Sequence, residues 1–130
     1  MAVPVVVGYV DTPEGRAALA HGARAASSRE SRLVVVIAST RGSELELDEL
    51  EEIVRSELDA SGVRHEIRHT ARSGDAAEAI VEVAQEIKAS LVVIGLRRRS
   101  AVGRLLLGSK AQRILLDAPC PVLAVKAETE

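Results

Sequence analysis

The residues best suited to chemistry in this sequence lie in a glycine- and arginine-rich segment that follows an apolar run. Arginines at 97–99 and 104 lie between Gly95 and a Gly-Ser pair at 108–109, where a helix-like stretch begins. This order is typical of an anion-binding turn, because the free N–H groups and the dipole of a helix N-terminus attract negative charge. An alternative for the arginines is a solvated loop that keeps the surface soluble. If the chain binds a phosphate, we expect it here.

The same segment is not a good P-loop. A P-loop ends in Gly-Lys-Ser/Thr, whereas residues 108–110 read Gly-Ser-Lys. Leucines at 105–107 also occupy the part that should be a flexible phosphate cradle. We therefore expect a different kind of phosphate-binding turn.

Apolar runs that alternate with helix-like stretches must position this segment. The β-branched and apolar runs predict five strands, at Val3–Val10, Leu33–Ile37, Val63–His69, Leu91–Ile94 and Val122–Val125. The stretches between them predict four helices, from a cap at Asp11 to Ser28, from Glu44 to a terminal Gly62, after a turn at Ser73–Asp75, and from Gly108-Ser109 to Pro119. Such alternation predicts an α/β fold, a doubly wound, five-stranded parallel sheet in a single domain over residues 1–130.

Two strand ends nominate the position of a binding site. Ligands of doubly wound sheets bind at the carboxyl ends of the strands, where the strand order reverses. The first strand ends at Asp11 and the fourth at Gly95. If these strands are neighbours, both residues line one crevice. Asp11 has the alternative role of a helix cap.

Composition excludes several classes of partner. The chain has one Tyr, no Phe or Trp and a net charge of −2, which argues against a nucleic-acid surface. A single cysteine, Cys120, suits a reducing compartment and reads as a small buried hydrophobe. No apolar run approaches the ~20 residues of a membrane span, and the N-terminus resembles no leader. We expect a cytoplasmic protein without membrane or nucleic-acid partners.

Residues of hydrolytic or metal sites do not gather in the sequence. His65 and His69 share one face of a strand pattern, but no further ligand is nominated nearby, so a structural or surface role is expected. No Ser-His-Asp or paired-carboxylate arrangement stands out. We expect no enzyme beyond, at most, slow hydrolysis of a bound phosphate compound, because no general base is evident.

The sequence resembles the universal stress protein family, whose ATP-binding members carry Gly-x2-Gly-x9-Gly-Ser/Thr after the fourth strand. Gly95 matches the first glycine, and Gly108 and Ser109 match the last pair. Three other segments are similar to the family's first strand, third helix start and closing strand, namely 7–14, 73–80 and 118–125. The resemblance implies a Rossmann-like fold of the adenine nucleotide alpha hydrolase type, with strand order 3-2-1-4-5.

One position departs from the family motif, because Arg98 replaces its second glycine. If that position needs a left-handed conformation, arginine costs about 1–2 kcal/mol, or roughly tenfold in affinity. A hydrogen bond from an arginine to a charged ligand returns about 1.5–3 kcal/mol. The substitution therefore leaves nucleotide binding open.

The resemblance further implies an adenine nucleotide, ATP or AMP, with Mg²⁺ as a candidate companion. Phosphates would lie over Gly95–Arg98 and Gly108-Ser109, with Asp11 near the ribose or phosphates and adenine against Ile37 and Ala38. Core packing is the alternative for Ile37 and Ala38, and helix capping for Ser109. The expected binding residues are Val10, Asp11, Ile37, Ala38, Ile94, Gly95, Arg97, Arg98, Gly108, Ser109 and Lys110.

Two functions are therefore expected from different classes. The first is an ATP-binding regulator of a stress response, and the alternative is a dimeric interaction module of the same family that binds no nucleotide. The last strand, Val122–Lys126, is apolar, and an exposed apolar edge tends to be paired or covered. The family pairs this strand with its copy in a second chain, so the resemblance implies a homodimer.

Overall fold

The fold is built on a parallel sheet with strand order β3-β2-β1-β4-β5, which confirms the predicted class and order. The computed structural model describes residues 3–37, 44–69, 76–96 and 108–127. The strands are β1 (Val5–Tyr9), β2 (Leu33–Ile37), β3 (His65–His69), β4 (Leu91–Leu96) and β5 (Val122–Lys126). The helices are α1 (Pro13–Ser28), α2 (Glu44–Ser61), α3 (Ala76–Ile87) and α4 (Ser109–Asp117).

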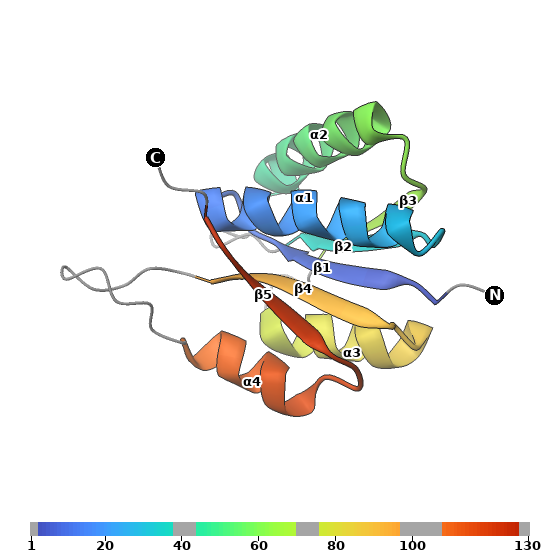
Figure 1. The fold of residues 1–130 in the computed structure, drawn as a ribbon. Helices are drawn as coiled ribbons and strands as arrows, with labels where there is room; N and C mark the ends of the chain where they lie inside the picture. The colour runs from blue at the N-terminus through green and yellow to red at the C-terminus, as the bar shows by residue number, and fades with distance from the viewer. Residues whose placement is uncertain (1–2, 38–43, 70–75, 97–107, 128–130) are drawn as a thin grey trace.

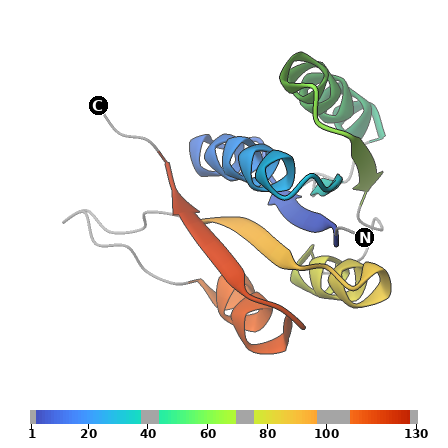
Figure 2. The same ribbon diagram turned by 45° about the vertical axis from the view of Figure 1, so that its right-hand side comes forward.

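Helices cover both faces of the sheet, α1 and α2 on one side and α3 and α4 on the other (Figures 1 and 2). Alternate residues of β1 therefore enter two separate cores, Val5 and Val7 beneath α1 and α2, and Val6 beneath α3. Every residue of β1 and β2 is buried. This two-sided burial explains why these strands read as continuous apolar runs instead of alternating ones.

The end of α2 follows the predicted glycine rule. The helix ends at Ser61, and Gly62 adopts a φ of +76°, a left-handed conformation that favours glycine. The Gly62 N–H donates to the carbonyl of Leu58 at 3.1 Å, which satisfies one of the last helical carbonyls.

The start of α1 corrects the predicted helix cap. Thr12, not Asp11, is the N-cap, because its Oγ1 accepts the Gly15 N–H at 3.0 Å. Pro13 then occupies the first helical position, where its missing N–H costs nothing. Aspartate and threonine both cap helices well. Which of these two adjacent residues is the N-cap therefore depends on the backbone conformation and not on the residue type.

Several strand boundaries also differ from the predictions. β1 and β3 are shorter than Val3–Val10 and Val63–His69, while β4 continues two residues beyond Ile94. The extension has a physical cause, since Gly95 and Leu96 pair with Val125 and Lys126 of β5. Gly95 therefore belongs to a strand and not to a loop.

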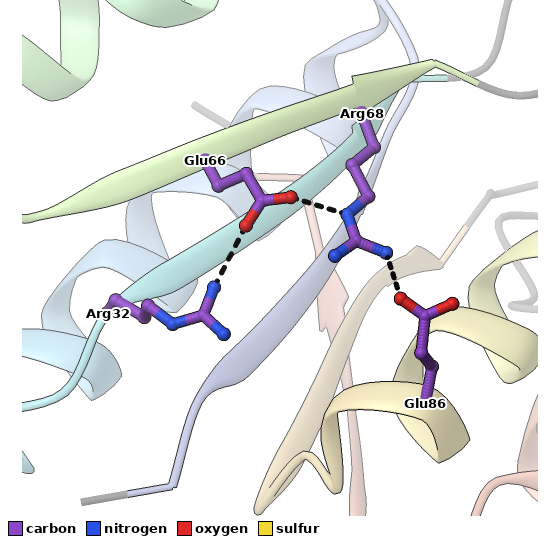
Figure 3. A network of polar contacts seen from close by, with 4 residues as sticks. All are labelled: Arg32, Glu66, Arg68 and Glu86. Carbon is purple, nitrogen blue, oxygen red and sulfur yellow. Dashed lines mark hydrogen bonds and ion pairs between the residues drawn. The ribbon is translucent and has the colours of Figure 1, made fainter.

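The edge strand β3 has partly exposed residues, as its alternating pattern predicts. A network of charged side chains covers one of its faces and reaches α3 (Figure 3). Glu66 accepts from Arg32 at 3.0 Å and from Arg68 at 2.6 Å, and Arg68 also donates to Glu86 at 2.9 Å. Charge on an edge strand discourages pairing with other chains.

No helix in the described ranges is long and apolar enough to cross a lipid bilayer.

Candidate functional site

The candidate site lies at the carboxyl ends of β1 and β4, which are neighbours in the sheet. The parallel backbone pairing of β1 with β4 ends at Val7 and Val93. By contrast, β1 pairs with β2 as far as Tyr9 and Ile37, and β4 pairs with β5 to its last residue. The helix that follows β1 covers one face and the helix that follows β4 covers the other (Figure 1). This is the switch point at which doubly wound sheets bind ligands.

On the β1 side, Asp11 is held by the helix that follows it. Its Oδ1 accepts from Arg16 Nη1 at 3.0 Å, and both side chains are about half exposed, at 52% and 49%. Val10 is also exposed, and its carbonyl accepts the Thr12 N–H at 2.7 Å. An exposed ion pair of this kind contributes at most about 1 kcal/mol. A ligand can therefore displace Arg16 from Asp11 at low cost.

On the β4 side, Gly95 has a steric role that the motif alone does not reveal. A Cβ at this position would lie 2.6 Å from the carbonyl oxygen of Glu14 in the first turn of α1. Real Cβ atoms essentially never approach a backbone atom so closely. Glycine therefore allows β4 to pack directly against the start of α1, whether or not a phosphate also lies there.

The start of α4 differs in detail from its prediction. Gly108 is the N-cap, with φ −68° and ψ 166°, and Ser109 is the first helical residue, so the capping role expected for Ser109 is wrong. The first helical hydrogen bond runs from Gln112 N–H to Gly108 O at 3.0 Å. The N–H groups of residues 109–111 precede that bond and lie outside the helical ladder.

The surroundings of this helix start suit an anion. Ser109 and Lys110 are exposed, and the first turn carries no acidic residue. A Cβ added at Gly108 would meet nothing within 4 Å, so the described residues leave space there. Free N–H groups, a nearby lysine and open space are the features an oxyanion needs.

The isoleucines of the predicted site are core residues. Ile37 is wholly buried in the core beneath α1 and α2, and Ile94 is 5% exposed in the core beneath α3 and α4. The packing role weighed for Ile37 is therefore confirmed, while its contact with adenine stays a prediction. Ala38, Arg97 and Arg98 lie outside the described residues.

Tyr9 is a polar residue at this edge that the sequence did not nominate. Its side chain is 1% exposed, and its hydroxyl has no hydrogen-bond partner among the residues that the structure describes. Burial raises the pKa of the Tyr9 phenol, and the negative charge of Asp11 raises it further. An unpaired buried hydroxyl costs about 1–3 kcal/mol. In the sequence, Tyr9 could have been nominated from its position two residues before Asp11.

The two histidines of β3 and the single cysteine make contacts that suit structural roles. His65 Nδ1 lies 3.0 Å from the carbonyl of Val63, and His69 Nε2 lies 2.7 Å from Glu51 Oε1. Cys120 packs against the core beneath α3 and α4, and burial raises the pKa of its thiol. Within the described part of the chain, no three His, Cys, Asp or Glu residues gather to hold a metal ion.

The fold and this edge define a Rossmann-like α/β protein with its candidate site at the β1–β4 switch point. Residues 1–126 match the model of the universal stress protein family, and the chain belongs to that family.

Individual relatives agree with this assignment. A universal stress protein of Mycolicibacterium smegmatis is 42% identical over 127 residues, which cover 94% of this chain and 96% of the relative. A universal stress protein solved in complex with cAMP superposes with a TM-score of 0.79 at 25% identity, covering 98% of both chains. The Archaeoglobus fulgidus universal stress protein in complex with dAMP gives 0.73 at 26% identity, covering 95% of this chain and 98% of that one.

Proposed function

We propose that this protein binds an adenine nucleotide, ATP or AMP, at the carboxyl edge of β1 and β4 and acts as a nucleotide-dependent regulator of a stress response. The observation that carries the proposal is the early end of the β1–β4 pairing, flanked by the starts of α1 and α4. The solved relatives that hold cAMP and dAMP support an adenine nucleotide as the ligand class.

The proposed contacts divide between the two sides of the edge. The N–H groups at the start of α4, with Ser109 and Lys110, take the phosphates, and Gly108 leaves room for them. Gly95 and Ile94 lie on the β4 side, Val10 and Asp11 on the β1 side, and Ile37 at the end proposed for adenine. Contacts from Ala38, Arg97 and Arg98 are proposed from the family motif alone, because these residues lie outside the described ranges.

Mg²⁺ fits the same arrangement through Asp11. Magnesium is commonly held by one or two carboxylates together with substrate phosphates and water, and Asp11 is a half-exposed carboxylate at this edge. The Arg16 guanidinium competes for the same oxygen. Mg²⁺ would therefore bind with the nucleotide rather than alone.

A substitution at Ser109 separates phosphate binding from folding. Ser109→Glu places a negative charge at the first position of α4, where the helix dipole favours it by about 0.3–1 kcal/mol. The same charge repels a phosphate. We expect unchanged or higher thermal stability, together with at least a tenfold loss of AMP and Mg-ATP affinity in calorimetric titration.

Ser109→Gln is the matched control, because it has the size of glutamate without the charge. Equal nucleotide affinity in the Glu and Gln variants would contradict a phosphate at this helix start. The wild-type protein supplies a second test, because one Tyr and no Trp give it little absorbance at 280 nm. Absence of both a co-purified 260 nm band and heat on titration with either nucleotide would overturn nucleotide binding.

We also propose that β5 pairs with its copy in a second chain to form a homodimer. The supporting observation is the apolar character of this edge strand, where Leu123 is 41% exposed. In the nucleotide-free alternative, this surface alone would carry the function as an interaction module.

A further inference from the structure

We infer that Arg16 of α1 binds an anionic group of the ligand directly, while Asp11 holds its guanidinium in place. The inference rests on the proposed nucleotide site and adds to it a phosphate-binding residue on the β1 side. Arg16 is the fourth residue of α1, and this helix begins at the same edge of the sheet as α4 (Figure 1).

The first observation is the position of this positive charge. Arg16 lies at the start of α1, where the helix dipole disfavours a cation. Its ion pair with Asp11 is about half exposed on both sides, and such pairs contribute at most about 1 kcal/mol. Stability therefore gives little reason for an arginine at this position, whereas an anionic ligand gives a direct one.

The second observation is the set of donors that Asp11 leaves free. Arg16 Nη1 donates to Asp11 Oδ1 at 3.0 Å, and the other two guanidinium nitrogens make no hydrogen bond or ion pair with the described residues. A guanidinium carries five N–H donors in a planar fork, so most of them remain available. Such a fork binds a phosphate through two parallel hydrogen bonds. Asp11 thus orients the fork without occupying it.

The third observation is the negative charge that a phosphate would meet on this side of the site. Half-buried Glu14 packs against the end of β4, since its Cγ lies 3.0 Å from a Cβ added at Gly95. Asp11 and Glu14 would both repel a phosphate. Arg16 is the only arginine or lysine between Asp11 and Arg24. It therefore supplies the positive charge that an anionic ligand needs beside these carboxylates.

The contact between α1 and β4 places this charge next to the predicted phosphate motif. The first turn of α1 packs directly on Gly95, because a Cβ there would lie 2.6 Å from the Glu14 carbonyl oxygen. The Arg16 side chain reaches back from that turn to Asp11, at the carboxyl end of β1. A phosphate between Gly95 and the start of α4 thus has an arginine on its opposite side.

The test titrates adenosine, AMP and ATP into the wild-type protein and Arg16→Gln by calorimetry, without divalent cations, so that Asp11 stays paired with Arg16. We expect Arg16→Gln to lose about three- to tenfold in AMP affinity and at least as much in ATP affinity. Its affinity for uncharged adenosine should stay unchanged. Arg24→Gln is the matched control, because Arg24 is an exposed arginine about two turns farther along α1. This control should bind all three compounds as the wild type does.

A second comparison separates a direct contact from simple neutralisation of Asp11. The Arg16→Gln substitution is repeated in an Asp11→Asn protein, where no carboxylate remains at position 11 to be neutralised. A direct contact predicts that Arg16→Gln still lowers AMP affinity in this background. A loss that disappears there would overturn the contact between Arg16 and the phosphate.

The single tyrosine reports on the ion pair in the ligand-free protein. Burial raises the pKa of Tyr9, the charge of Asp11 raises it further, and the charge of Arg16 lowers it. Arg16→Gln should therefore raise the pKa of Tyr9 in an absorbance titration of the phenol, and Arg24→Gln should leave it unchanged. An unchanged pKa in Arg16→Gln would show that Arg16 is not held beside Asp11 in solution, which would also overturn the inference.

The outcomes distinguish this inference from the proposed function. AMP affinities that are equal in Arg16→Gln and Arg24→Gln, or equal losses for adenosine and AMP, would overturn the role of Arg16 and leave nucleotide binding intact. Failure of both AMP and ATP to bind the wild-type protein would overturn both.

Discussion

At the scale of a single residue, Gly95 is required for packing and is also part of the candidate binding motif. Because an added Cβ would lie 2.6 Å from the Glu14 carbonyl, Gly95→Ala must push α1 away from β4. We expect the free energy of unfolding to fall by about 1–3 kcal/mol, as in other overpacked sites. Gly108→Ala, in open space, should lose less than about 1 kcal/mol through its weaker cap.

Chemical denaturation of the two variants measures this difference. Equal stability of the two alanine variants would show that Gly95 is not needed for the contact between β4 and α1. Nucleotide titration of the same proteins asks a separate question, since Gly108→Ala tests phosphate access without a large change in stability.

Tyr9 supports a second prediction at the residue scale, because a single phenol titrates without overlap. Burial first, and then Asp11, raise the pKa of Tyr9 in the folded protein above its ordinary value near 10. Stability from the neutral buried phenol is complete below the unfolded pKa and is lost as pH rises toward the folded pKa. Tyr9→Phe should therefore lose less stability than the wild type between about pH 9 and 11.

Thermal unfolding across that range, with absorbance at 295 nm to follow ionisation, provides the measurement. A folded wild-type protein that ionises at or below the pKa of a free tyrosine would contradict the buried environment of this hydroxyl.

At the scale of elements, the charged network on β3 contributes to the stability of the fold in a way that depends on pH. Arg68 first, and Arg32 less strongly, lower the pKa of Glu66 (Figure 3). The stability that this carboxylate adds is present above its unfolded pKa and is lost as pH falls through the lower folded pKa. The Glu66 side chain is 42% exposed, so the loss should be below about 1 kcal/mol.

Glu66→Gln should therefore be less stable than the wild type at pH 7 and should converge with it near pH 3. Urea denaturation at both pH values measures the effect, and Glu52→Gln, at an exposed position on α2, is the matched control. A stability difference for Glu66→Gln that persists undiminished at pH 3 would rule out the ion pairs as its cause.

The elements also show what the sequence can and cannot predict. Leu33–Ile37 forms β2 with the predicted bounds, because full burial on both faces leaves an unambiguous apolar run. The end of β4 was missed, since its last residues are held by pairing with β5, a contact thirty residues away in the chain. The Tyr9 hydroxyl was missed for the same reason, as only the folded neighbours show that it is unpaired.

At the scale of the whole molecule, the two edges of the sheet differ in a way that favours one mode of assembly. The β3 edge carries the charged network of Glu66 and Arg68, whereas Leu123 is exposed on the edge strand β5. Exposed apolar edges tend to be paired or covered, and charged ones resist pairing. We therefore expect a dimer through β5, not through β3.

Leu123→Lys should shift the protein from dimer to monomer, because a charged side chain on an edge strand opposes pairing with a second chain. Ile53→Lys is the matched control, since Ile53 on α2 is exposed to a similar degree, 49% against 41% for Leu123. Light scattering coupled to size exclusion at micromolar concentration measures the mass of each protein. A monomeric wild-type protein would contradict the proposed dimer. If the Leu123→Lys variant remained dimeric, the interface would not include this strand.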